Sequence, residues 1–178
     1  MSSTQDFLSP HSGFHQALKG LAIAGSLWNA GSMTTAYRLL PSVYPAVQTS
    51  RKLATKQWAF YYWALSRTVP PTDLATILIC GGLAYVERRE NKAALAWKLW
   101  ATAAGVMPIG WVWVWTLMLK PSNKLLAISE APESVTEEKD PESLRATNLL
   151  KEFNSLMGVR MLFPWAVGGL ALWASLLR

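Results

Sequence analysis

The chain has 178 residues, of which 51% are hydrophobic and only 16% are charged, and it contains 10 tryptophans. A soluble domain of this length needs more polar residues to cover its surface, so the composition argues against an ordinary soluble protein and favours a small membrane protein. The net charge of +6 does not indicate a nucleic-acid partner, because basic residues flank the apolar segments whereas acidic ones gather between residues 130 and 152. The expected surroundings of the chain are therefore a lipid bilayer.

Four segments are long and apolar enough to cross a bilayer, for which about 20 residues are needed. They are residues 16–37, 69–86, 93–119 and 156–177. The sequence thus predicts an all-α integral membrane protein in which residues 1–178 form one domain, a four-helix bundle.

The first span contains an amide near its middle, Asn29, next to Trp28. An amide at that depth has no water to bond and must find another partner. Two interpretations are open: Asn29 holds a neighbouring helix, or it points into a ligand pocket.

The segment between the first and second spans mixes basic and aromatic residues. Residues 50–67 are expected to form an interfacial helix, since Trp58 and Tyr61 suit the level of the lipid headgroups. Pro70 and Pro71 are expected to break that helix. Asp73 then falls in the first turn of the next helix, where the helix dipole favours a negative charge, and a catalytic role is the alternative.

The third span contains Trp97 and Trp100, which share a helical face. They either form stacking walls for a planar substrate or simply pack against other helices. After this span, residues 127–150 read as an acidic, solvated loop. Counting Lys and Arg on each side places this loop in the cytosol and both termini on the opposite side.

Arg160 is a charged residue inside the last predicted span. A guanidinium there either reaches the lipid phosphates or an acidic residue such as Glu152, or it faces inward and is a candidate functional group. In the second case its planar fork of donors suits an anionic or enolic oxygen.

Two stretches, "MPIGWVWVWTLMLKPSNKLL" and, after the acidic loop, "LLKEFNSLMGVRMLFPWAVGGL", resemble the DUF1772 family of small four-helix membrane proteins, which includes the fungal anthrone oxygenases. Pro121, Asn123 and Leu126 match a Pro-x-Asn-x-x-Leu motif of that family, and Arg160 matches an arginine near the start of its last helix. The chain departs from the family at Phe153, where a tryptophan is usual, and at Met157, where Asn or His is frequent.

The resemblance implies a membrane-embedded monooxygenase of fungal aromatic polyketide biosynthesis, placed in the endoplasmic reticulum, that oxidises a hydrophobic anthrone with O2. No cofactor is expected: no nucleotide-binding fingerprint is present, and the two histidines of the chain, His11 and His15, do not form a metal-binding pattern with Cys or carboxylates. A membrane cyclase or isomerase, and a carrier or scaffold without catalysis, are the alternatives.

The predicted site residues follow from this reaction. Arg160 and Asn123 would hold the enolate oxygens, and His15 would act as the base. The expected substrate contacts are Asn29, Trp28, Tyr61, Trp97 and Trp100.

Overall fold

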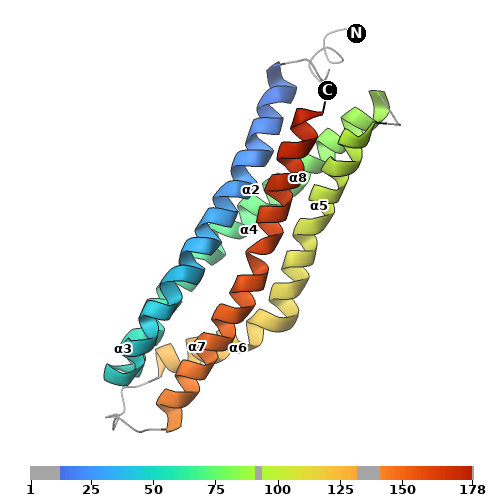
Figure 1. Ribbon diagram of the computed structural model, residues 1–178. Coiled ribbons are helices and arrows are strands. Elements are labelled where there is room, and N and C mark those ends of the chain that lie inside the picture. The colour runs from blue at the N-terminus through green and yellow to red at the C-terminus, as the bar shows by residue number, and fades with distance from the viewer. Residues whose placement is uncertain (1–12, 91–93, 132–140, 178) are drawn as a thin grey trace. The chain divides into compact units, whose positions relative to one another are not determined.

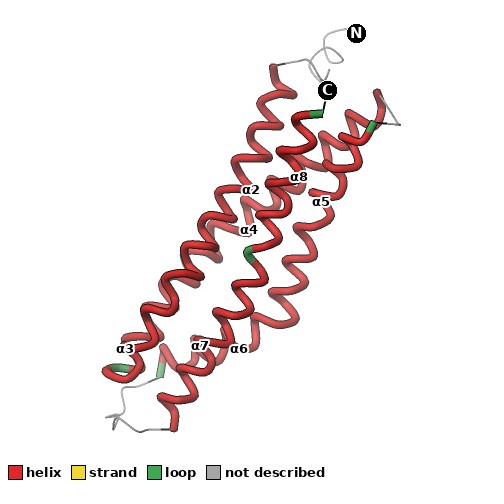
Figure 2. The backbone as a smooth tube through the Cα atoms, in the orientation of Figure 1, coloured by secondary structure: helices red, strands yellow, loops and turns green. Residues whose placement is uncertain are grey.

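The computed structural model describes residues 13–90, 94–131 and 141–177, and almost all of this part of the chain is helical, with no strand among these residues (Figure 2). The prediction of an all-α protein is therefore confirmed. The helices, labelled in Figure 1, are α2 (Gly13–Leu39), the 3-10 helix η1 (Leu40–Val43), α3 (Tyr44–Thr49), α4 (Arg51–Glu90), α5 (Leu95–Trp113), the π-helix η2 (Val114–Met118), α6 (Leu119–Glu130), α7 (Pro141–Arg160) and α8 (Leu162–Leu176).

Three helical stretches of the described chain are long and apolar enough to cross a membrane, namely Arg51–Glu90, Leu95–Glu130 and Leu144–Leu176. These stretches mark the chain as a membrane protein and contain most of the second, third and fourth predicted spans. The first predicted span, 16–37, lies within the 27-residue helix α2. It is not one of the three, because polar residues such as Lys19, Ser26 and Asn29 lower its hydropathy.

Helix α4 is continuous over 40 residues and contains Pro70 and Pro71 in its interior. The predicted break was wrong, and the expected interfacial helix 50–67 and span 69–86 form one helix. A proline removes one backbone hydrogen bond, but breaking the helix in apolar surroundings would leave several backbone groups unpaired. Asp73 consequently lies in the middle of α4, so its expected place in a first helical turn was also wrong.

The third predicted span and the acidic loop also differ from expectation. Helical structure continues from α5 through η2 and α6 to Glu130, beyond the predicted end at residue 119. Pro121 has no N–H to donate to the Leu117 carbonyl, and the π-helical turn of η2 ends three residues before Pro121. The predicted loop 127–150 is thus helical up to Glu130 and again from Pro141, while its middle lies outside the described residues.

Helix α7 begins at Pro141, in agreement with the preference for proline in the first helical turn. The last predicted span, 156–177, combines the end of α7 with α8, and a turn at Met161 separates the two helices. Pro164 has no N–H to donate to the Arg160 carbonyl, which explains the interruption at this point.

The chain divides into two compact units. The first comprises Met1–Ala30, Val69–Gly110 and Leu162–Arg178, and the second comprises Gly31–Thr68 and Trp111–Met161. In the first unit, fully buried Trp100 of α5 belongs to a core formed with α2, α4 and α8; its other buried members include Ala22, Leu83, Met107, Val167 and Ala171.

Glycines allow close helix contacts within the first unit. A Cβ atom on Gly168 of α8 would lie 2.9 Å from Leu27 Cδ2 and 3.2 Å from Ser26 Oγ of α2. A Cβ atom on Gly110 of α5 would lie 3.4 Å from the ring of Phe163, where α8 runs beside α5 (Figure 1). Small residues at these points bring helix backbones close enough for extensive van der Waals contact.

We expect Gly168→Leu to lower the free energy of unfolding by about 1–3 kcal/mol, because its side chain overfills the contact with α2. Gly169→Leu is the matched control, since a Cβ atom there meets nothing within 4 Å. Both variants gain the same helix propensity, so the difference between them measures the contact. Unfolding in detergent micelles checks this, and equal midpoints for the two variants would contradict it.

Candidate functional site

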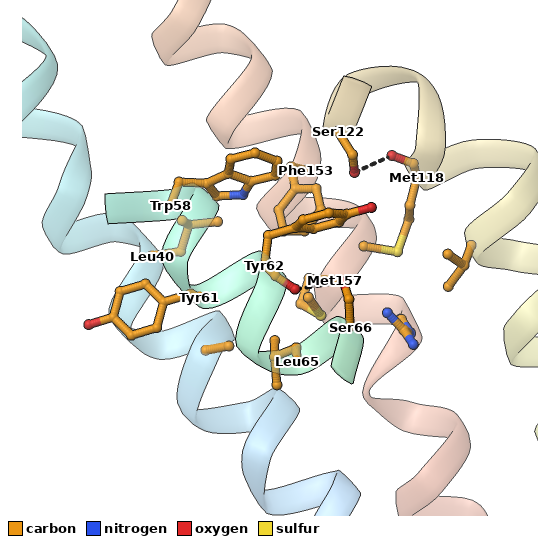
Figure 3. Close-up of a pocket in the computed structure, with 13 residues that line it drawn as sticks. Leu40, Trp58, Tyr61, Tyr62, Leu65, Ser66, Met118, Ser122, Phe153 and Met157 are labelled. Atoms are coloured by element: carbon orange, nitrogen blue, oxygen red, sulfur yellow. Dashed lines mark hydrogen bonds between the residues drawn. The ribbon is translucent and has the colours of Figure 1, made fainter. Parts of the chain in front are cut away.

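The second unit contains a pocket walled mainly by aromatic and thioether side chains (Figure 3), which we call the aromatic pocket. Its residues come from α2, η1, α4, η2, α6 and α7. They are Ala36, Leu40, Trp58, Tyr61, Tyr62, Leu65, Ser66, Val114, Met118, Ser122, Phe153, Met157 and Arg160.

Helical spacing explains how the walls arise. Trp58 and Tyr62 are one turn apart on α4, and their rings stack with centroids 5.1 Å apart and planes 22° apart. Phe153 and Met157 are likewise one turn apart on α7, and the Phe153 ring meets Trp58 edge to face at 5.2 Å. Figure 3 shows the Tyr62 ring lying toward Phe153 and Met118, whereas Tyr61 extends away from them. The result is an apolar slot suited to flat rings.

Two serine hydroxyl groups, those of Ser66 and Ser122, line the aromatic pocket. Ser66 Oγ donates to the Tyr62 carbonyl at 2.6 Å, and Ser122 Oγ donates to the Met118 carbonyl at 2.7 Å. Each proton is thus used within its own helix, while each hydroxyl oxygen can still accept a hydrogen bond.

Among the described residues that line the aromatic pocket, Arg160 alone is charged. It is half-buried and ends α7, where the negative end of the helix dipole favours a cation. A guanidinium beside apolar walls interacts strongly with an oxyanion, because little water screens the pair. The pocket therefore combines stacking surfaces with one donor group for an anionic oxygen.

The aromatic pocket is narrow, with a cavity volume of about 40 Å³. This volume holds water or dioxygen, whereas pockets for larger ligands usually measure about 300–1,000 Å³. A tricyclic ligand enters only if wall side chains move. Tyr61 and Tyr62 are not fully buried, so their rings have space on one side.

The structure brings two predicted site residues, Tyr61 and Arg160, into the aromatic pocket. Asn123 does not line it: the side chain is exposed, whereas its neighbour Ser122 is 1% exposed and faces the pocket. Successive residues of a helix point about 100° apart, so the motif that contains both could not reveal which one faces inward.

The predicted tryptophan contacts lie elsewhere. Trp28 is 67% exposed and lines no pocket described in this chain. Trp100 is buried in the core of the first unit, and Trp97 of the same unit lies 5.2 Å beneath the guanidinium of Arg88. These positions favour packing over substrate stacking for both residues of α5.

Asn29 and Asp73 form a buried polar pair in the first unit. Asn29 Nδ2 donates to Asp73 Oδ1 at 2.6 Å, and the two residues are 0% and 3% exposed. Within the described chain, Asn29 Oδ1 has no hydrogen-bond partner. The pair joins α2 to α4 and agrees with the interpretation of Asn29 as a helix-holding residue.

His15 belongs to a buried ionic cluster of the first unit. Glu87 Oε1 lies 2.8 Å from Lys19 Nζ and 3.4 Å from His15 Nε2. Burial is the main cause that lowers the pKa of His15 below its usual 6.5; the charge of Lys19 acts in the same direction, and the bond to Glu87 opposes it. His15 is 2% exposed and lies in the first unit, whereas the aromatic pocket belongs to the second.

The sequence prediction missed most walls of the aromatic pocket. Trp58 was assigned to the lipid interface, yet it is 1% exposed and central to the wall. Phe153, Met157 and Arg160 recur at helical spacing, and this spacing in the sequence could have indicated that they share the face of α7 that lines the pocket. Phe153 and Met157 are also the two positions at which the chain departs from the family pattern. Among the described residues, no three His, Cys, Asp or Glu side chains lie close enough together to hold a metal ion.

The fold and the site together define the class of this protein: an all-helical membrane protein with an aromatic pocket. The sequence model of the anthrone oxygenase family matches residues 58–170, which include every lining residue of the pocket except Ala36 and Leu40. The chain belongs to this family.

A curated relative, the anthrone oxygenase ptaC of Pestalotiopsis fici, is 29% identical over 110 residues, which are 61% of this chain and 75% of the relative. No solved structure matches the chain.

The His15 cluster predicts a pH-dependent stability. Because the folded-state pKa of His15 is below the unfolded value of 6.5, the unfolded chain binds more protons near that pH, and stability falls as pH drops through 6.5. We expect the thermal midpoint in detergent to fall between about pH 7.5 and about pH 5.5. His15→Gln should flatten this slope, and an unchanged slope in that variant would assign the effect to other groups.

The buried amide predicts an energetic coupling. Asn29→Leu removes a donor to the Asp73 carboxylate and should lower the free energy of unfolding by about 1–3 kcal/mol. Asp73→Leu should lower the free energy of unfolding less in the Asn29→Leu variant than in the wild-type chain, because the partner of Asp73 is already absent from that variant. A double-mutant cycle on purified protein measures the coupling, and additive effects of the two substitutions would show that the pair contributes nothing.

Proposed function

We propose that this protein is a membrane-embedded oxygenase that oxidises the methylene carbon of an anthrone-type phenolic tricycle with O2, without a cofactor, in fungal aromatic polyketide biosynthesis. The observation that carries the proposal is the aromatic pocket, in which flat apolar walls meet the guanidinium of Arg160 within the region that matches the family. The name of the relative in Pestalotiopsis fici agrees with this reaction.

The proposed setting is the endoplasmic reticulum membrane, crossed by four helices. Three helical stretches have the length and composition of a span, and α2 would be the fourth. A helix of 27 residues is about 40 Å long, enough to cross the hydrocarbon core. A hydrophobic polyketide would reach the aromatic pocket from the lipid, where such a molecule concentrates.

The chemistry balances with O2 as the oxidant. Loss of one proton from the methylene carbon gives an enolate, whose carbon adds O2 and forms a peroxide after protonation. Loss of the second proton from that carbon breaks the O–O bond, forms the C=O bond and releases water. The carbon loses four electrons and O2 gains four, so the substrate supplies all the electrons.

The residues of the aromatic pocket have distinct proposed roles in this sequence. Trp58, Tyr62 and Phe153 would stack on the rings after the pocket opens, and Arg160 would pair with the oxygen that becomes negative. Pairing of this kind favours the ionised form of the substrate, so it eases the loss of the first proton. The base is assigned to His15 only as a prediction, and comparing turnover by wild type and His15→Gln tests it.

Removing Arg160 tests the proposal. We expect Arg160→Met to lower turnover by at least about tenfold, because one charge-assisted hydrogen bond contributes about 1.5–3 kcal/mol. Arg160→Lys keeps the charge but loses the planar fork, so it should retain only a small part of the activity. The measurements are oxygen consumption and quinone absorbance with a hydroxylated anthrone, at matched protein abundance in membranes.

Lys151→Met is the matched control, because Lys151 is an exposed cation on the same helix that does not line the aromatic pocket. It should keep wild-type turnover. Wild-type turnover by Arg160→Met would show that Arg160 takes no part in the reaction. Product formation without O2 would instead point to a cyclase or isomerase.

A further inference from the structure

A second pocket of the second unit is lined by three basic and four apolar residues, and we call it the basic pocket. Its cavity volume is about 280 Å³, and its lining residues are Arg51, Lys124, Ala127, Ile128, Ala131, Arg145 and Leu149. It shares no lining residue with the aromatic pocket, and no carboxylate of the described residues, which leave out 132–140, lines it.

The positions of the cations along the chain place the basic pocket near helix ends. Arg51 is the first residue of α4, Lys124 lies in the middle of α6, and Arg145 lies near the start of α7. Arg51 and Arg145 lie at the starts of the membrane-length stretches Arg51–Glu90 and Leu144–Leu176, and Lys124 lies six residues before the end of Leu95–Glu130. The basic pocket therefore lies where such helices leave the apolar part of a bilayer.

The local structure holds the cations around one cavity. Ser50 Oγ accepts a hydrogen bond from the Leu53 N–H at 3.2 Å and so caps α4, which starts the helix at Arg51. Arg51 is only 9% exposed, so protein surrounds its side chain. α6 packs on α7, which brings Lys124 and Arg145 to the same cavity (Figure 1). The positive end of the α4 dipole adds to the field of the three cations.

This arrangement fits a phosphate group attached to an apolar body. The guanidinium groups of Arg51 and Arg145 suit phosphate oxygens, and Lys124 adds a third positive charge. Ile128 and Leu149 offer an apolar surface beside the cations, which a free inorganic anion would not use. Basic pockets between membrane helices recognise anionic lipid headgroups through this combination.

We propose that the basic pocket binds the phosphate headgroup of an anionic phospholipid at the membrane surface. The lipid contacts α4, α6 and α7 at once, so it stabilises the second unit. This inference is independent of the proposed oxygenase reaction, because no residue assigned to that reaction lines the basic pocket.

The experiment uses the full chain in nanodiscs of phosphatidylcholine with or without about one fifth phosphatidic acid, a fraction that leaves the disc fluid and gives it negative surface charge. Phosphatidic acid should raise the thermal midpoint of the wild-type protein. In detergent, a titration with phosphatidic acid should give an apparent Kd about tenfold higher for Lys124→Gln than for the wild type. Adding Arg145→Gln to Lys124→Gln should raise the apparent Kd about tenfold further. Inorganic phosphate forms a parallel arm and should produce little shift.

Lys120→Gln is the matched control, since Lys120 is an exposed lysine one turn before Lys124 on α6 that does not line the basic pocket. It should bind phosphatidic acid like the wild type. Equal binding by the double variant and the wild type overturns the site, as does an equal loss in Lys120→Gln. An inorganic phosphate shift as large as that of phosphatidic acid overturns the lipid assignment and leaves a soluble phosphate as the ligand.

Discussion

The structure depends on one constraint: in an apolar environment each backbone N–H and C=O must pair within its own helix, because no water is available to replace a lost hydrogen bond. Helix α4 therefore continues through Pro70 and Pro71, and helical structure continues past Pro121 into α6. Hydroxyl groups obey the same constraint, as Thr68 and Ser122 donate to the carbonyl groups four residues earlier. Only at Met161 does the last stretch deviate, three residues before Pro164.

The same constraint shapes the polar residues of the first unit. A buried amide and a buried carboxylate, Asn29 and Asp73, bond to each other, and Lys19 and Glu87 form a short ion pair at 2.8 Å. Each pair connects α2 with α4. Because a buried polar group without a partner is costly, such pairs oppose sliding of one helix along the other. The close contacts at Gly25 and Gly168 add a steric restriction to the same helix, α2.

The second unit separates two kinds of chemistry along its helices. The aromatic pocket places Arg160 beside Met157 and other apolar walls, whereas the basic pocket gathers three cations from α4, α6 and α7. A single guanidinium in apolar surroundings suits a charge that forms during a reaction, and several cations at a membrane surface suit a charge that is always present. This difference is why we assign a reaction to the first pocket and a lipid to the second.

Sequence alone determined the helical class, the approximate positions of three membrane-length stretches and the family, and it predicted Arg160 as a site residue. These features follow from local composition and from motifs, which neighbouring helices do not alter. Tertiary structure decided whether the helices continue through their prolines, because that depends on what surrounds the backbone. It also decided that Ser122 and not Asn123 lines the aromatic pocket, that Trp58 is a wall and Trp28 is exposed, and that Asn29 meets Asp73. Each of these outcomes depends on the rotation of one helix against another, and residues far apart in the sequence set that rotation through their packing.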